Sequence, residues 1–298
     1  MEIIMRALAK RLSFACAYFL ATAGFAADCS LPLAFNHKTR DDVTPVYGDQ
    51  TAIAFKAPMA VNTDGAPTSY HPDDPAGGKG LAINTICNGA NAKLPDGTVL
   101  DWRKCSQLIA AFNQAKDHWT EPGKPKIEFY AVATKASGVP CTISSGPHAG
   151  YFVSTTALAA DPSKDRCDPA HWLDALTVPF IIYPGAENFT KRGVGVGDLA
   201  ALYNPTNDTV VYAIVGDRGP RLGLSEGSIA VAKALLKRSD DPKSRRDTYG
   251  YAVRNAGVVI LPKAAMKPPY TAERIRIAGE AALAAWGGTE RLKACTNR

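Results

Sequence analysis

The sequence lacks the patterns that identify several common kinds of site. No Cys-x-x-Cys pair occurs and the five histidines are scattered, so we expect no metal site. No G-x-S-x-G motif stands between a predicted strand and helix, which argues against a serine hydrolase. The Gly-rich run Gly193–Asp198 is followed by no predicted helix, so we expect no nucleotide or other cofactor. Lys and Arg form no stripe with interleaved aromatic residues, and we expect no nucleic-acid partner.

Long apolar runs are also missing, apart from one near the N-terminus. Three basic residues precede the apolar stretch Leu12–Ala26, which ends in small residues. This pattern is typical of a secretory signal peptide, with cleavage after Ala26. The stretch is short for a membrane span and no longer one follows, so we expect a secreted protein, extracellular or periplasmic, with no membrane partner. Because residues 27–298 contain neither a Gly/Ser-rich linker nor an internal repeat, we predict one domain and a monomer.

Cysteine and charge are present in modest amounts. The net charge is +6, and it falls to about +4 when the predicted signal peptide, with three basic residues and one acidic residue, is removed. Six cysteines remain after that cleavage, and an even number in an exported chain predicts three disulfides. Six cysteines allow fifteen pairings, and the sequence does not choose among them. The cysteines are Cys29, Cys87, Cys105, Cys141, Cys167 and Cys295.

Hydrophobic spacing predicts many short strands and few helices. This pattern favours a mainly β (α+β) fold, and we predict a single β-barrel domain of about six strands with about three flanking helices. The segment 28–50 is polar and contains two prolines, so we expect it to be irregular. The predicted strands are Ile53–Val61, Leu81–Cys87, Ile127–Thr134, Tyr151–Thr155, Val178–Tyr183 and Val258–Leu261. Asp198–Asn204 fits the end of a strand or a turn. The predicted helices are Trp102–His118, a central one after residue 225, and Thr271–Trp286, which Thr271 caps and Gly287 ends.

The stretch Val210–Leu236 carries the strongest candidate for chemistry. A β-branched run predicts a strand that ends before Asp217, and glycines and a proline then enforce a loop. Ser225 fits an N-cap, which would place Glu226 in the first turn of the following helix. Two carboxylates at the two ends of one short loop can face a common cleft, an arrangement that suits acid–base chemistry. The spacing alone is more often that of two solvated acidic residues.

Four blocks of the sequence resemble the fungal-type chitosanases of glycoside hydrolase family 75. The central block reads YAIVGDRGPRLGLSEGSIAVAKAL, where Ser225 replaces the glycine that usually precedes Glu in the family. The other blocks are FKAPMAVNTDGAP, GYFVSTTAL and VPFIIYPG, and together they extend from about Phe55 to Pro262. The resemblance implies a secreted endo-acting hydrolase of chitosan that inverts the anomeric carbon. It also brings, by analogy with other small inverting glycosidases, the expectation of a double-psi type of barrel.

Carried over residue by residue, the resemblance makes Asp217 and Glu226 the catalytic pair and matches Asp64 to a family acid of less certain role. An inverting pair lies about 6.5–9.5 Å apart, with room for a water molecule. A helix macrodipole would keep Glu226 ionised as the base, and partial burial would raise the pKa of Asp217, as an acid needs. We therefore expect Asp217 to be the acid and Glu226 the base.

Substrate contacts are predicted from acidic and aromatic residues near these blocks. Acidic side chains can bind glucosamine ammonium groups, and aromatic rings can stack on sugars, although an aromatic residue beside a strand more often belongs to the core. The acidic candidates are Asp64, Asp73 and Asp74, and the aromatic candidates are Tyr70, Tyr151 and Trp172. The chain is basic and chitosan is a polycation, which counts against this substrate. Because a scaffold does not fix the substrate, two alternatives remain open: a glycosidase for peptidoglycan or a β-glucan, and a glycan-binding protein without activity.

Overall fold

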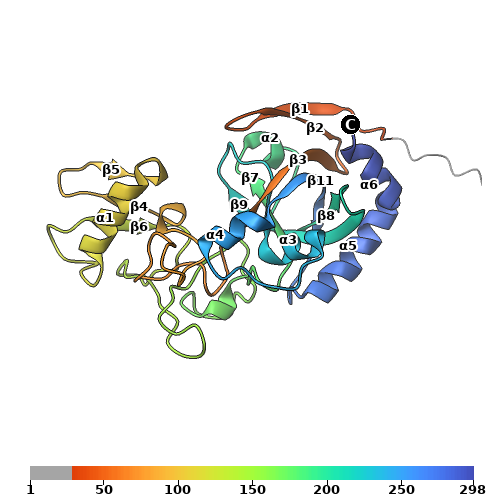
Figure 1. Cartoon of the computed structure of the whole chain (residues 1–298). Helices are drawn as coiled ribbons and strands as arrows, with labels where there is room; N and C mark the ends of the chain where they lie inside the picture. The colour runs from red at the N-terminus through yellow and green to blue at the C-terminus, as the bar shows by residue number, and fades with distance from the viewer. Residues whose placement is uncertain (1–28) are drawn as a thin grey trace, which may run out of the picture.

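A computed structural model describes residues 29–298, which form a mostly β fold around a closed barrel of six strands (Figure 1). The predicted signal peptide lies outside the described residues. Two of the six ladders are parallel, and β11 pairs back onto β3 to close the barrel. The strand order is β3 (Ile53–Asn62), β10 (Glu226–Ser228), β7 (Phe180–Pro184), β9 (Thr209–Gly219), β8 (Asp198–Asn204) and β11 (Val253–Ala265). A barrel of about six strands is therefore confirmed, and its double-psi character stays a prediction.

The barrel strands are buried on both faces. Their inner side chains, such as Phe55 and Val215, form the largest core cluster. The outer side chains of the same strands, such as Ala54 and Ile214, pack beneath α5 (Ala272–Trp286) and α6 (Gly288–Thr296). Because both faces are covered, β8 is buried at all seven positions. This is why its sequence shows no alternation and could be read as a strand end or a turn.

The structure describes six α-helices between residues 29 and 298, more than the expected three. Thr271 caps α5 by accepting a hydrogen bond from the backbone of Arg274, as predicted, and Gly287 ends that helix. The chain then starts α6 at once, where we expected only a tail. The remaining helices are α1 (Cys105–Ala115), α2 (Glu187–Thr190), α3 (Ile229–Leu236) and α4 (Arg245–Thr248).

A hairpin precedes the barrel where we expected irregular chain. β1 (Leu33–Lys38) pairs antiparallel with β2 (Val43–Gly48), which pairs in turn with β3. The expectation was wrong because polar residues and Pro45 hid the pattern. Both features are tolerated because β1 is an edge strand and β2 pairs with β3 only at Tyr47 and Gly48, so Pro45 has a ladder on one side only.

A second, smaller sheet lies to one side of the barrel (Figure 1, left). Its strands are β4 (Ala90–Lys93), β5 (Val99–Leu100) and β6 (Lys126–Phe129), and α1 packs on them. This part, which we call the side lobe (residues 63–175), has a core of its own around Phe112 and Phe152. Much of it is loop, and the strands expected at Leu81–Cys87 and Tyr151–Thr155 are not strands of the structure.

Three disulfides form, as the cysteine count predicted. Cys29–Cys295 joins the start of the described chain to α6, while Cys87–Cys105 and Cys141–Cys167 lie within the side lobe. Disulfides of this kind are typical of exported proteins. Over residues 29–298, no helix is both long and apolar enough to cross a membrane.

Candidate active site

A bulge in β9 turns Asp217 toward the outer face of the barrel. Val215 points into the barrel core, and strict alternation would make the residue two positions later do the same. Gly216 is an extra residue in the ladder with β7, so Asp217 pairs with Ile182, whose side chain is on the outer face. Gly216 has no room for a side chain, because a Cβ there would lie 2.6 Å from the Cβ of Phe180.

Glu226 belongs to the short strand β10 and not to a helix. It pairs in parallel with Ala60 of β3 and antiparallel with Ile182 of β7. Asp217 and Glu226 therefore flank the same residue of β7 from its two sides, and all three side chains share one face of the sheet. Two strand spacings put the two Cα atoms about 9–10 Å apart. The separation of the carboxyl groups stays a prediction.

The start of α3 corrects one expectation. Ser228, not Ser225, is the N-cap, and its hydroxyl accepts a hydrogen bond from the backbone of Val231. Both serines suit a cap, but residues Glu226–Ser228 form strand β10, which pairs with β3 and β7, so the helix begins only after them. The helix macrodipole therefore gives no reason to treat Glu226 as the ionised member of the pair.

Asn62 connects the side chain of Glu226 to the backbone of Asp64. Its Nδ2 donates to Oε2 of Glu226 at 3.3 Å, and its Oδ1 accepts from the backbone of Asp64 at 2.7 Å. The two contacts fix which end of the amide faces which residue. Asp64 follows β3 in the predicted turn, where Gly65 has a φ of +90° and donates to the hydroxyl of Ser154. Glu226 and Asp64 are thus positioned by the same end of β3.

A second chain of hydrogen bonds holds the carboxyl of Asp64. The hydroxyl of Tyr70 donates to Oδ1 of Asp64 at 2.6 Å, and Nδ2 of Asn84 donates to the Tyr70 oxygen at 3.0 Å. Tyr70 is 2% exposed, and a Cβ at Gly89 would lie 2.8 Å from its ring, so the ring is enclosed. Tyr70 therefore supports Asp64 and offers no face for a sugar to stack on.

Three of the other predicted contacts lie away from this cluster. Asp73 forms a surface ion pair with Lys116. The Tyr151 hydroxyl donates to the carbonyl of Leu81 at 2.8 Å. The carboxylate of Asp74 is buried and accepts hydrogen bonds from backbone amides of its own loop, so it organises that loop. None of the three predicted residues lines the cavity described next.

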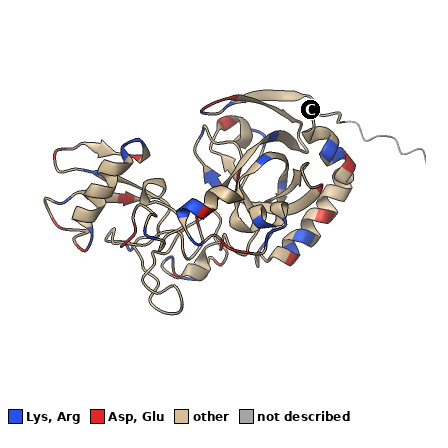
Figure 2. Ribbon diagram, viewed as in Figure 1, with Lys and Arg blue, Asp and Glu red and all other residues tan. Residues whose placement is uncertain are grey.

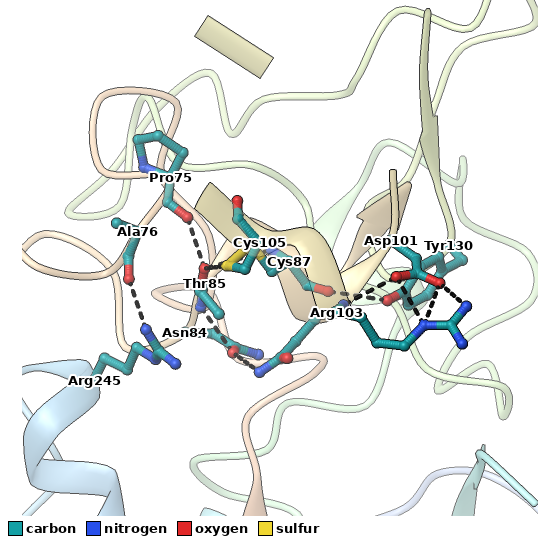
Figure 3. Close-up of a disulfide and its surroundings, with 11 residues drawn as sticks. Pro75, Ala76, Asn84, Thr85, Cys87, Asp101, Arg103, Cys105, Tyr130 and Arg245 are labelled. Carbon is teal, nitrogen blue, oxygen red and sulfur yellow. Dashed lines mark hydrogen bonds and ion pairs between the residues drawn. A yellow bond between two sulfur atoms is a disulfide. The ribbon is translucent and has the colours of Figure 1, made fainter. Parts of the chain in front are cut away.

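A cavity of about 1130 Å³ lies where the outer face of the barrel meets the side lobe. Asp64, Asp217 and Glu226 all line it, and they are the only acidic residues of the described chain that do. Figure 3 shows part of the wall, where the Cys87–Cys105 disulfide lies beside Asn84 and the Tyr130 hydroxyl is directed to the carbonyl of Cys87. The aromatic side chains of the lining are those of Trp102, Tyr130, Trp172 and Tyr249.

Burial raises the pKa of all three carboxyl groups. For Asp64 it raises the pKa to about 8, with repulsion from the other two carboxylates adding to the effect. For Asp217 burial raises the pKa to about 6, against two backbone hydrogen bonds that lower it. Burial also raises the pKa of Glu226, which has only the Asn62 amide to oppose it. Three carboxyl groups with raised pKa values in one cavity are typical of a site that moves protons.

No protein family and no curated protein was found to match the chain. The resemblance to the chitosanases therefore stays a prediction, and the site is defined by its geometry. Sequence reasoning singled out Asp64, Asp217 and Glu226 but missed Asn62. The one available signal was its position, directly before the turn that carries Asp64.

Proposed function

We propose that the chain is a secreted glycoside hydrolase that cleaves a polysaccharide with inversion of the anomeric carbon. The observation that carries this proposal is the placement of Asp217 and Glu226 on either side of Ile182, facing one cavity. Such hydrolysis requires one protonated carboxyl and one carboxylate with space for a water molecule between them. The resemblance implies an endo-acting enzyme and chitosan as its substrate, whereas the charges of the cavity, described in the next subsection, favour an acidic glycan.

The hydrogen bonds favour the opposite roles from those expected. Oδ1 of Asp217 accepts from the backbone of Ala157 at 2.9 Å and of Arg218 at 2.8 Å. Two such donors favour the ionised form, whereas Glu226 accepts only the longer hydrogen bond from Asn62. We therefore assign the base to Asp217 and the acid to Glu226.

In this mechanism Glu226 gives its proton to the glycosidic oxygen as the bond to the anomeric carbon breaks. Asp217 takes a proton from a water molecule, whose oxygen attacks the same carbon from the opposite face. One sugar chain leaves with a new hydroxyl, and the other gains a hydroxyl at the inverted anomeric carbon. The two carboxyl groups have then exchanged their protonation states and return to the start through solvent.

The two roles can be separated with substrates of different leaving groups. Glu226→Gln should lower polysaccharide hydrolysis by about 10²–10⁴-fold and recover activity on glycosides whose leaving group needs no proton. Asp217→Asn should lose both activities, because the water is no longer activated. Equal activity of wild type and both variants, measured as released reducing ends, would end the catalytic assignment.

A further inference from the structure

The cavity contains a group of basic side chains that the proposed mechanism does not use. They are Arg40, Arg166, Arg218 and Arg245, and no lysine accompanies them in the lining. The lining has three acidic residues, and one of them, Asp64, has a pKa raised to about 8 and so keeps its proton at neutral pH. Near neutral pH, arginine charges therefore outnumber carboxylate charges in the cavity lining. A polycation such as chitosan would meet repulsion in this cavity.

None of these four arginines has a carboxylate partner within residues 29–298. Three other arginines of these residues do have one: Arg103 pairs with Asp101, Arg238 pairs with Asp240, and Arg276 on α5 pairs with Glu273 and Glu280. Figure 2 shows both charge signs along α5. What sets the four apart is that they lie in one cavity, where no ion pair of the described residues neutralises their charge.

Two of the four guanidinium groups are held by tryptophan rings. The Arg40 guanidinium, in the turn between β1 and β2, lies 4.2 Å from the ring centre of Trp102. The Arg166 guanidinium lies 5.3 Å from the ring centre of Trp172, and both rings line the cavity. Stacking restricts the side chain and leaves the N–H groups at its edge free to donate.

The other two guanidinium groups are held by single carbonyl groups. Arg245 of α4 donates one hydrogen bond to the carbonyl of Ala76 at 3.1 Å, as Figure 3 shows. Arg218 reaches the carbonyl of Gly185 at 3.5 Å. A guanidinium has five N–H donors, so one carbonyl leaves most of them unused.

We propose that the glycan bound in this cavity carries carboxylate groups. This inference rests on the proposed function for its cleavage step, but the binding it predicts does not. A carboxylate matches the fork of a guanidinium and can accept two parallel hydrogen bonds from it. Four such forks around one cavity suit an acidic polysaccharide, in which a carboxylate recurs along the chain.

The test compares an acidic polymer with its uncharged form. Binding of Glu226→Gln would be measured to β-1,4-glucuronan and to its carboxyl-reduced form, with peptidoglycan and chitosan in parallel. We expect at least tenfold tighter binding to an acidic polymer than to its uncharged form, with the difference reduced at 0.5 M salt. The double variant Arg166→Gln/Arg245→Gln should lose most of the difference. Arg40→Gln, which changes an exposed side chain, provides a second variant should the double one fold poorly.

Arg276→Gln is the matched control, because it removes the same charge from the outer side of α5. Preference for chitosan, binding to none of these polymers, or a charge preference that the cavity variants leave unchanged would overturn the inference. Hydrolysis of chitosan that Glu226→Gln abolishes would support the hydrolase and reject the acidic substrate. Binding of acidic polymers with no hydrolysis by wild type would support the acidic glycan and reject the hydrolase.

Discussion

The hydroxyl of Tyr70 lies 2.6 Å from Oδ1 of Asp64, deep enough in the side lobe that only 2% of the tyrosine is exposed. Asp64 in turn follows Asn62, whose amide reaches Glu226. The side lobe and the barrel are therefore connected through hydrogen bonds at the site itself. A substitution in the side lobe should therefore affect the carboxylate of Glu226 in the barrel.

Tyr70→Phe should test this connection. The variant leaves the ring in place but removes the donor to Asp64 and the acceptor for Asn84. Leaving buried polar groups without partners costs about 1–3 kcal/mol in the free energy of unfolding. Urea denaturation measures the loss, and we expect activity to fall with it, since Asp64 is less restrained. An unchanged unfolding midpoint would show that the hydrogen bond contributes nothing.

The raised pKa of Asp64 predicts a pH dependence of stability. Its pKa is about 8 in the folded chain, so the folded state keeps a proton that the unfolded state loses near pH 4. Above pH 4 the unfolded state therefore binds fewer protons, and stability should fall as the pH rises until about pH 8. The slope from this one group is at most about 1.4 kcal/mol per pH unit.

Asp64→Asn should remove that part of the pH dependence. We expect its free energy of unfolding to change less than that of wild type between pH 5 and pH 8, as measured by urea denaturation at both values. Asp73→Asn is the control, because Lys116 holds the pKa of Asp73 below its ordinary value and this carboxylate stays ionised throughout that range. The same slope in Asp64→Asn and wild type would contradict the raised pKa.

Gly216→Ala should disturb both the barrel and Asp217. A Cβ at this position would lie 2.6 Å from the Cβ of Phe180 and 2.8 Å from Cδ1 of Leu173. Overpacking of this kind costs about 1–3 kcal/mol, and the bulge that turns Asp217 outward must shift to relieve it. We expect a lower melting temperature and a larger loss of kcat than of substrate binding. Gly78→Ala, which meets no atom within 4 Å, is the matched control.

Much of the fold can be predicted from local sequence. β3 and α5 were predicted within a residue or two, because both have clear apolar spacing and definite turn or cap residues at their ends. β8 was ambiguous because burial on both faces removes alternation. The hairpin β1–β2 was missed because strands that are unpaired along part of one side tolerate polar residues and proline. Such elements depend on their place in the sheet more than on their own residues.

The site shows the same division between local and tertiary information. Asp217 and Glu226 were found because they flank one loop, but the strand at Glu226 exists only because β3 and β7 leave a gap for it. Asp73 was predicted to bind substrate ammonium groups because it is acidic and lies near the matching blocks, yet it lies on the surface. The four cavity arginines come from segments far apart in the sequence, so no spacing rule could have grouped them.

His37 provides a last test, because it forms a hydrogen bond with the loop between the two proposed catalytic residues, Asp217 and Glu226. The ring is 5% exposed, its Nε2 donates to the carbonyl of Gly223 at 3.0 Å, and it packs against Phe189. Burial lowers the pKa of His37, so the folded state holds it neutral. The unfolded state takes up a proton below about pH 6.5, and this contribution to stability should therefore be lost as the pH falls.

His37→Ala should release the loop. We expect faster amide hydrogen exchange at Leu224 and Glu226, a free energy of unfolding lower by about 2–3 kcal/mol at pH 7.5, and a smaller deficit near pH 5, where wild type has lost the histidine contribution. His118→Ala is the control, because that ring is exposed and its Nδ1 lies 2.7 Å from Oε1 of Glu121 at the surface. If the deficit of His37→Ala grows on acidification, His37 is charged in the folded chain. The loop would then be held by an ionic contact instead of a neutral hydrogen bond.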